Sequence, residues 1–234
     1  MSLSNAMGRH WGRQMNTKWI QVLIVLTALI STAGASLQAA SKDNISDGVQ
    51  AIEFARELGA TLPPKGWVRF CERHPEDCAG NTGERLRVKL DAERWQELSG
   101  VNTYVNRSIE PATDLALYNV EELWTYPKAR GDCEDYVLLK RQHLLDLGWP
   151  REALLITVVL DAKRAGHAVL TVMTDMGEFV LDNQHPKILP WTATGYQFVK
   201  RQAQIDQTKW VALDPIASSM RRYTSSGRKV GGGR

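Results

Sequence analysis

The sequence predicts an α+β fold in which helices precede an antiparallel sheet, and two features of the 234-residue chain support this. Apolar residues at helical spacing dominate as far as residue 147, and short runs rich in β-branched residues dominate from residue 154 onward. Helices first and consecutive strands afterwards are typical of an α+β domain. The chain is long enough to build one such domain with a substantial core.

The predicted helices are bounded by glycine and proline. The first ends at Gly59, the second contains Gly100 as a candidate interruption and stops before Pro111, and the third has Gly148 at its C-cap position. Between the second and third, the chain has no regular pattern. The three helical segments are Gln50–Leu58, Glu84–Arg107 and Asp132–Leu147.

Short β-like runs follow the last helix. A charged turn at Asp161–Gly166 separates the first two runs, and Asp175–Gly177 forms the next turn. The predicted strands are Leu154–Leu160, His167–Thr174, Glu178–Asp182, Tyr196–Lys200 and Lys209–Leu213.

The net charge of +3 is unevenly distributed. Residues 1–42 carry +4 and residues 216–234 carry +5, with no acidic residue in either segment, which leaves −6 on the chain between them. A nucleic-acid-binding domain would concentrate basic charge on its folded part, so nucleic acid is not an expected partner. Residues 41–215 form the predicted domain, and residues 216–234 are expected to be a basic, disordered tail.

Residues 1–40 have the pattern of a secretory signal peptide. Arg9, Arg13 and Lys18 precede the apolar run Trp19–Ile30, and Ala33–Ala35 offers a small-residue cleavage site. The run is shorter than the ~20 apolar residues of a membrane span. A buried helix or an uncleaved anchor is the alternative. The first seven residues resemble a tag remnant or an upstream start.

Export changes the interpretation of the three cysteines. Cys71 and Cys78 lie seven residues apart in a loop-like stretch, and an oxidising compartment favours a disulfide between them. The alternative is a metal site that also uses His74, which lacks an obvious fourth ligand. Cys133 remains unpaired and requires an explanation.

Cys133 follows Gly131-Asp132 at the first turn of its predicted helix. The unpaired amide N–H groups of a helix N-terminus stabilise a thiolate and could also hold an oxyanion. A small buried residue is the alternative role.

His167 and Asp182 could complete a catalytic triad with Cys133. If a two-residue turn pairs Thr174 with Gly177, Asp182 lies opposite Val169 and on the same face as His167. A three-residue turn would separate the two side chains. On the favourable register Asp182 fixes the imidazole tautomer, and the imidazole takes the thiol proton.

These residues resemble the bacterial transglutaminase-like cysteine proteinases of the LapG type, over roughly Trp67 to Pro215. The resemblance implies a papain/transglutaminase-like fold, with an N-terminal helical lobe before the sheet. It also implies that Cys133 is the nucleophile, His167 the general base and then acid, and Asp182 the orienting carboxylate. The matching residues are Val101-Asn102, Val105-Asn106, Ile109, Pro111, Asp114, Tyr118, Glu121, Trp124, Pro127, Gly131-Asp132-Cys133-Glu134-Asp135-Tyr136, Gly166-His167-Ala168-Val169-Leu170 and Leu181-Asp182-Asn183.

Asp132, Glu134 and Asp135 place negative charge beside the candidate nucleophile, which opposes thiolate formation. A bound Ca²⁺ would resolve this conflict, since several carboxylates within one turn suit that ion better than Mg²⁺. The resemblance implies calcium dependence, with Asp132 and Glu134 as ligands and Asp135 as a weaker candidate. Complementation of the helix dipole is the alternative.

Three further residues have open roles. Trp124 could line the cleft or pack in the core, Asn183 could support Asp182 or begin a turn, and His185 is interpreted as a loop histidine.

The expected function is that of a periplasmic, calcium-dependent cysteine endopeptidase. The resemblance implies a large surface adhesin as substrate, cleaved near its N-terminus so that cells leave a biofilm. It also implies inhibition by an inner-membrane cyclic di-GMP receptor. The alternatives are another acyl-transfer enzyme with the same triad, such as a transglutaminase or a cell-wall amidase, and a non-enzymatic binding module on the same fold.

Overall fold

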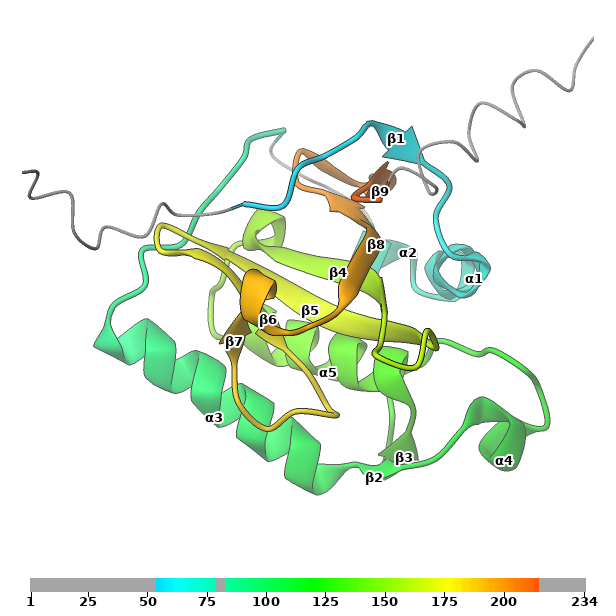
Figure 1. The fold of residues 1–234 in the computed structure, drawn as a ribbon. Coiled ribbons are helices and arrows are strands. Elements are labelled where there is room, and N and C mark those ends of the chain that lie inside the picture. Colours follow the sequence, from blue (N-terminus) through cyan, green and yellow to red (C-terminus); the bar gives the residue numbers. More distant parts are fainter. Residues whose placement is uncertain (1–53, 79–82, 215–234) are drawn as a thin grey trace, which may run out of the picture. The chain divides into compact units, whose positions relative to one another are not determined.

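An antiparallel sheet of seven strands organises residues 54–78 and 83–214, the part of the chain that this computed structural model describes (Figure 1). The strand order is β1-β9-β8-β4-β5-β6-β7, and each neighbouring pair is antiparallel. The strands are β1 (Ala60–Thr61), β4 (Leu154–Leu160), β5 (Gly166–Thr174), β6 (Gly177–Leu181), β7 (Leu189–Pro190), β8 (Gln197–Ala203) and β9 (Asp206–Ala212).

The helices belong mainly to the first half of the described chain, as the α+β prediction requires. They are α1 (Lys65–Arg73), α2 (Pro75–Cys78), α3 (Ala92–Ser108), α4 (Asp114–Tyr118) and α5 (Cys133–Asp146), with short 3₁₀ turns at Arg151–Ala153 and Trp191–Ala193. Two short strands, β2 (Glu110–Pro111) and β3 (Arg130–Gly131), pair in parallel beside α5. The predicted α+β fold class is confirmed, although β1, an edge strand of the main sheet, precedes the helices.

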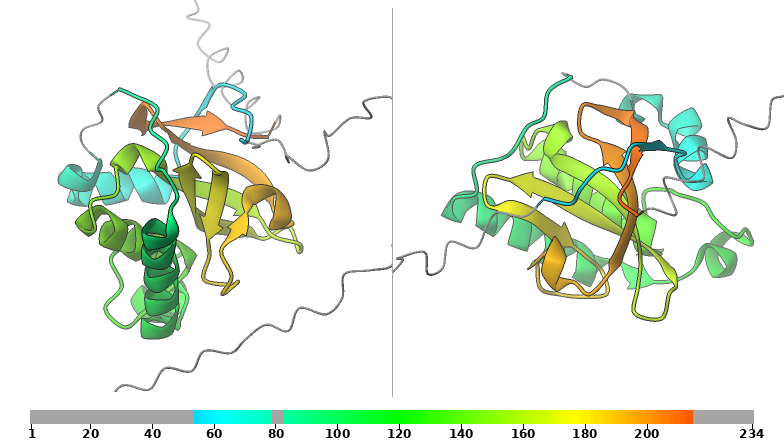
Figure 2. Two further views of the ribbon diagram at one scale, coloured as in Figure 1. Left: turned by 90° about the vertical axis from the view of Figure 1, so that its left-hand side faces the viewer. Right: turned by 45° about the horizontal axis from the view of Figure 1, so that its top comes forward.

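The main core lies between the sheet and helices α3 and α5, which cover one face of it (Figure 2). Ala168, Leu170 and Val172 of β5 point into this core, whereas Val169 packs in a smaller cluster with residues of β4, β6 and β8. This alternation is what a strand covered on both faces requires. Strand β5 lies next to the central strand β4 and begins beside the head of α5, where the Ala168 N–H contacts the Cys133 sulfur.

All five predicted strands are present, and the register of the β5–β6 hairpin is the favourable one. Thr174 pairs with Gly177 across a two-residue turn, and Leu170 pairs with Leu181. The next position along this register sets Asp182 opposite Val169. The condition for a shared His167–Asp182 face is therefore met.

The predicted helix Glu84–Arg107 is wrong in its first eight residues. Helix α3 begins only at Ala92, where the Asp91 side chain accepts from the Arg94 N–H at 2.9 Å and caps it. Before it, Val88 forms backbone hydrogen bonds with Met173 and Asp175 at the end of β5. Gly100 does not interrupt the helix.

The predicted helix Gln50–Leu58 is also wrong for its described residues, 54–58, which are not helical. The Leu58 N–H donates to the Ala212 carbonyl at 2.8 Å, and the Ala55 N–H donates to the Glu178 carboxylate at 2.9 Å. Tertiary hydrogen bonding therefore prevails over local helix propensity. Residues 50–53 lie outside the described residues.

Cys71 and Cys78 form the predicted disulfide, with an S–S distance of 2.03 Å and a Cα–Cα distance of 5.6 Å. This excludes the alternative in which both thiols and His74 bind a metal. The segment is not a loop, however, because Cys71 lies in α1 and Cys78 ends α2. The amphipathic α1, which buries Trp67 and Phe70, was not predicted.

Helix α5 matches the prediction closely. Asp132 is its N-cap, Leu147 its C-cap, and Gly148 adopts the left-handed conformation that ends it, with φ of +78°. In the described ranges, no helix has the length and apolar character needed to cross a bilayer. The predicted signal peptide (1–40) and basic tail (216–234) lie outside these ranges.

Candidate active site

The backbone before α5 brings Cys133 to the head of that helix. The β2–β3 pairing holds Gly131 beside Pro111, and the Gly131 carbonyl accepts from the Ala112 N–H at 2.9 Å. A Cβ on Gly131 would lie 2.6 Å from a carboxylate oxygen of Asp135, so only glycine permits this approach. Cys133 is the first helical residue, where the amide N–H groups are free of intrahelical partners.

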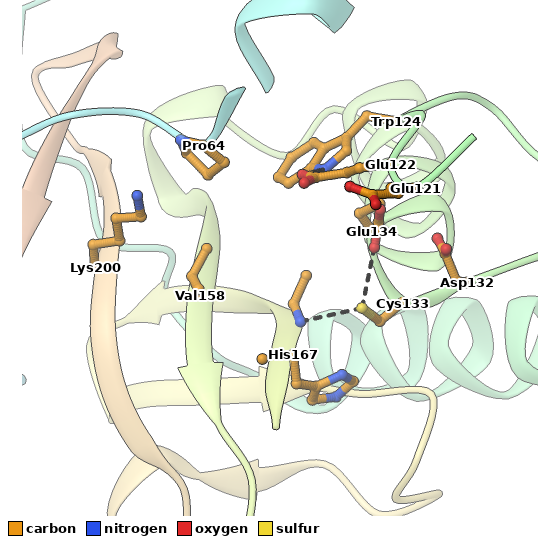
Figure 3. A pocket seen from close by; sticks show the side chains of 12 residues that line it. Pro64, Glu121, Glu122, Trp124, Asp132, Cys133, Glu134, Val158, His167 and Lys200 are labelled. Atoms are coloured by element: carbon orange, nitrogen blue, oxygen red, sulfur yellow. Dashed lines mark hydrogen bonds between the residues drawn. The ribbon is translucent and has the colours of Figure 1, made fainter. Parts of the chain in front are cut away.

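The Cys133 thiol sits between two partners. It donates to the Glu134 carboxylate at 3.1 Å and accepts from the Ala168 N–H at 3.4 Å (Figure 3). Burial and the negative charge of Glu134 raise the pKa of the thiol well above its ordinary value. In the geometry of this structure the thiol is therefore protonated.

His167 and Asp182 form a buried pair next to this thiol. The imidazole Nε2 lies 2.8 Å from Asp182 Oδ1, and the two side chains are 1% and 3% exposed. Burial opposes charge on Asp182, but hydrogen bonds from His167 and from Tyr196 outweigh it and hold the pKa of the carboxyl below its usual value. Asp182 is thus an ionised acceptor, which fixes the proton of a neutral imidazole on Nε2 and leaves Nδ1 as the accepting nitrogen.

The thiol and the imidazole line one cleft of about 450 Å³. In the described part of the chain, the hydrogen bonds of the thiol go to Glu134 and Ala168 rather than to His167. The imidazole Nδ1 lies 3.3 Å from the side-chain nitrogen Nε2 of Gln184. Direct proton transfer therefore requires the thiol to turn from Glu134 toward Nδ1.

Trp124 forms part of the cleft wall as well as of the core, so both open roles hold. Its ring packs edge-on against Trp67. Its indole N–H donates to Glu122 at 2.9 Å, and the two side chains lie together on the cleft wall (Figure 3). A Cβ on Gly66 would overlap the Trp124 ring, which makes glycine necessary there. Lys200 lies on the opposite wall and donates to the Leu62 carbonyl at 3.0 Å.

Three carboxylates gather beside the thiol: Asp114, Asp132 and Glu134 offer oxygens that all lie within 4.8 Å of one another. One oxygen of Asp114 and one of Asp132 are buried and have no hydrogen-bond partner. Burial and mutual repulsion raise the pKa of Glu134 to about 8, and burial raises the pKa of Asp114 and of Asp132. Crowded, unpartnered carboxylate oxygens fit a hard divalent cation, which accepts oxygen ligands.

Asp135, the third predicted ligand, lies outside this group of three. Its Oδ1 accepts from the Thr125 N–H at 2.9 Å, while its Oδ2 is buried without a partner. Burial raises the pKa of Asp135 to about 7. The structure thus brings Asp132 and Glu134 together with Asp114, and points one Asp135 oxygen at the loop before β3.

Sequence reasoning did not assign Asp114, Gln184 or Tyr196 to the site. Asp114 lies 18 residues before Asp132 and was noted only as part of the family pattern. Tyr196 was predicted only as the start of a strand, and no local signal linked it to Asp182. The backbone N–H of Gln184 donates to Asp182 at 2.9 Å, a role that had been considered for Asn183. His185 is exposed, as expected of a loop histidine.

The fold and the site together define an α+β protein with a cysteine at a helix head beside a buried His–Asp pair. A family model for bacterial transglutaminase-like cysteine proteinases (BTLCP) matches residues 57–217. The chain therefore belongs to that family of cysteine peptidases.

Solved structures similar to this chain include three of LapG from Legionella pneumophila. An EGTA-treated form is 26% identical (TM-score 0.41) and is matched over 48% of this chain and 64% of its own, less than two thirds of its length. A calcium-bound form is 22% identical (TM-score 0.45) and is matched over 58% of this chain and 82% of its own. A third structure is 23% identical (TM-score 0.44) and is matched over 58% of this chain and 78% of its own. No curated protein matches the chain.

Proposed function

We propose that this chain is a periplasmic, calcium-dependent cysteine endopeptidase in which Cys133, His167 and Asp182 act as the catalytic triad. The observation that carries the proposal is the buried 2.8 Å His167–Asp182 pair in the same cleft as a cysteine at a helix N-terminus. A nucleophile, a base and a group that orients the base are the parts that acyl transfer requires.

The roles of the three residues follow from their contacts. Asp182 holds the imidazole with its proton on Nε2, so that Nδ1 accepts the thiol proton once the thiol turns from Glu134. The sulfur attacks the peptide carbonyl, and the protonated imidazole gives its proton to the leaving amine as the C–N bond breaks. Water then hydrolyses the thioester with His167 as base. Free amide N–H groups at the head of α5 are positioned to stabilise the oxyanion.

The calcium part of the proposal rests on Asp114, Asp132 and Glu134. A cation held by these carboxylates would supply positive charge beside the thiol, where burial and Glu134 otherwise keep the sulfur protonated. Asp135 remains the weaker candidate, because one of its oxygens is already engaged by Thr125.

The family resemblance extends the proposal to substrate, partner and location. The substrate is a large surface adhesin cleaved near its N-terminus, which promotes release from a biofilm, and the inhibitor is an inner-membrane cyclic di-GMP receptor. The basic, then apolar, N-terminal pattern supports export to the periplasm.

The decisive experiment measures cleavage of a peptide substrate by the wild type, Cys133→Ser and His167→Ala. Each protein is assayed in Ca²⁺, in Mg²⁺ and in excess chelator. We expect cleavage only by the wild type, its loss on chelation, and better recovery with Ca²⁺ than with Mg²⁺. Cleavage retained by Cys133→Ser would end the cysteine-peptidase proposal. Linkage of an added amine to the peptide, instead of cleavage, would identify a transglutaminase.

Calorimetry with Ca²⁺ tests the ligand set. Asp114→Asn and Asp132→Asn should each weaken binding at least tenfold, since each removes one charged ligand. Asp135→Asn should weaken it less. Glu93→Gln, an exposed residue of α3, is the matched control and should bind as the wild type does. Full activity of the wild type in chelator would contradict the calcium proposal.

A further inference from the structure

The Asp182 carboxylate has a third partner besides the His167 imidazole and the Gln184 backbone. The Tyr196 hydroxyl donates to Asp182 Oδ2 at 2.5 Å, on the oxygen that does not contact the imidazole. Oδ1 meanwhile accepts from His167 and from the Gln184 N–H. The hydroxyl is therefore the side-chain group that fixes the rotation of the carboxylate from its free end.

Tyr196 also contacts the imidazole itself. Its ring lies edge-on to His167, with ring centroids 5.6 Å apart and an interplanar angle of 67°. A T-shaped contact of this kind restricts rotation of both rings. One side chain thus touches both members of the His167–Asp182 pair.

The backbone holds Tyr196 firmly enough for this purpose. Tyr196 directly precedes β8, its N–H donates to the Thr194 hydroxyl at 3.2 Å, and its ring packs against the cluster that contains Val169 and Phe198. Burial and the neighbouring Asp182 charge raise the pKa of Tyr196, so the phenol stays a donor over the whole working range of pH.

We propose that Tyr196 is a positioning residue of the active site: its hydroxyl locks the Asp182 carboxylate and its ring locks the imidazole, so that Nδ1 of His167 is kept unprotonated and able to accept the thiol proton. The inference rests on the proposed function, because it assigns Tyr196 a task in activating Cys133. It adds a fourth side chain to Cys133, His167 and Asp182, and this side chain comes from the segment just before β8 rather than from the β5–β6 hairpin.

The test is Tyr196→Phe, which keeps the ring and removes only the hydroxyl. Tyr126→Phe is the matched control, because Tyr126 also donates its hydroxyl to an aspartate, Asp77, away from the cleft. Iodoacetamide reports on Cys133 alone, since the other two of the three cysteines are in the disulfide. With Ca²⁺ present, the alkylation rate should fall roughly tenfold in Tyr196→Phe, as expected for loss of a hydrogen bond to a charged group, and remain unchanged in Tyr126→Phe.

Nitrogen NMR of the imidazole provides a readout that a merely structural role would not move. The wild type should show His167 as the Nε2–H tautomer with a slowly exchanging Tyr196 hydroxyl proton, and Tyr196→Phe should show a mixture of tautomers. A wild-type Nδ1–H tautomer, or wild-type alkylation rate and tautomer in Tyr196→Phe, would overturn the inference.

The two proposals fail separately. If wild-type Cys133 is alkylated no faster than Cys133 in His167→Ala, the proposed function fails, while the tautomer spectra still decide the role of Tyr196. If wild-type alkylation depends on His167 but Tyr196→Phe is indistinguishable from the wild type in both readouts, only the Tyr196 inference fails. The wild-type spectrum does not depend on whether the variant folds.

Discussion

Removing divalent cations should make the stability of this protein fall steeply as the pH rises, and Glu134 is the main reason. Its side chain is buried, with 8% of the residue exposed, and it lies among Asp132, Asp114 and the Cys133 thiol. Burial and the charge of Asp132 raise the pKa of Glu134 from 4.5 to about 8. Folding without a cation therefore favours the protonated form.

The sign and size of the effect follow from linkage. The pKa of the folded state lies above that of the unfolded state, so the stabilisation by the bound proton is complete below pH 4.5 and is lost as the pH rises through about 8. A tenfold change in an acid dissociation constant corresponds to about 1.4 kcal/mol, so ionisation of Glu134 alone removes at most about 5 kcal/mol across this window. That is comparable with the whole stability of many domains.

Urea unfolding followed by tryptophan fluorescence measures this directly. In excess chelator, the free energy of unfolding should fall between about pH 5 and about pH 7, below the range in which deprotonation of the buried Lys140 adds an opposite trend. Saturating Ca²⁺ should remove most of the fall if the proposed site binds it through the ionised carboxylates. Glu134→Gln should flatten the profile in chelator. Glu93→Gln, exposed on α3, should leave the wild-type profile intact.

A wild-type profile in chelator that is flat, or that rises over this window, would refute the reasoning. It would mean that Glu134 leaves its buried position when the cation is absent. A profile that falls equally in Glu134→Gln would assign the effect to Asp132 or Asp135 instead, whose pKa values burial also raises.

Three further changes test the packing around the site. Cys71→Ser should lower the free energy of unfolding by about 2–3 kcal/mol in urea, because it opens a short disulfide loop. Lys140→Met should raise the free energy of unfolding by up to about 4 kcal/mol at neutral pH, because burial lowers the pKa of Lys140 from 10.5 to about 7. The charged lysine destabilises the folded state fully below about pH 7, so the stability gained by Lys140→Met should vanish above pH 10.5. Gly66→Ala should reduce cleavage severalfold in a peptidase assay, because the added Cβ displaces Trp124 from the cleft wall, whereas Gly100→Ala, with open space around its Cβ, should keep full activity and gain about 0.5–1 kcal/mol in urea unfolding.

The second half of the fold could be predicted because its signals are local. The alternation of β5, the turn at Asp175-Met176 and the glycine that ends α5 each act within a few residues. The predictions of secondary structure fail where a hydrogen-bond partner far away in the sequence determines the backbone conformation. Residues 54–58 and Val88 look compatible with helix, but their backbone groups bond to β9 and to the end of β5.

The same distinction explains the site. Cys133, His167 and Asp182 could be proposed from the sequence because a helix head and a hairpin register place them, and the 2.8 Å contact of His167 with Asp182 follows from that register. The positions of Asp114 and Tyr196 depend on how the first turn of α4 packs beside α5, and on how the segment before β8 packs beside the end of β6. No hydrophobic period or residue spacing in the sequence predicts these tertiary contacts.

The acidic group shows why the distant partner matters chemically. Asp132 and Glu134 alone could simply complement the dipole of α5, since acids at a helix N-terminus are stabilising. Asp114 changes that balance: it is buried, its Oδ2 accepts from the Leu123 N–H, and its Oδ1 remains without a partner beside two further carboxylates. The buried Asp114 adds repulsion to the two carboxylates that flank the cysteine, and a bound cation would offset that repulsion. The case for calcium is therefore stronger with Asp114 in place than it was from the two carboxylates that flank the cysteine.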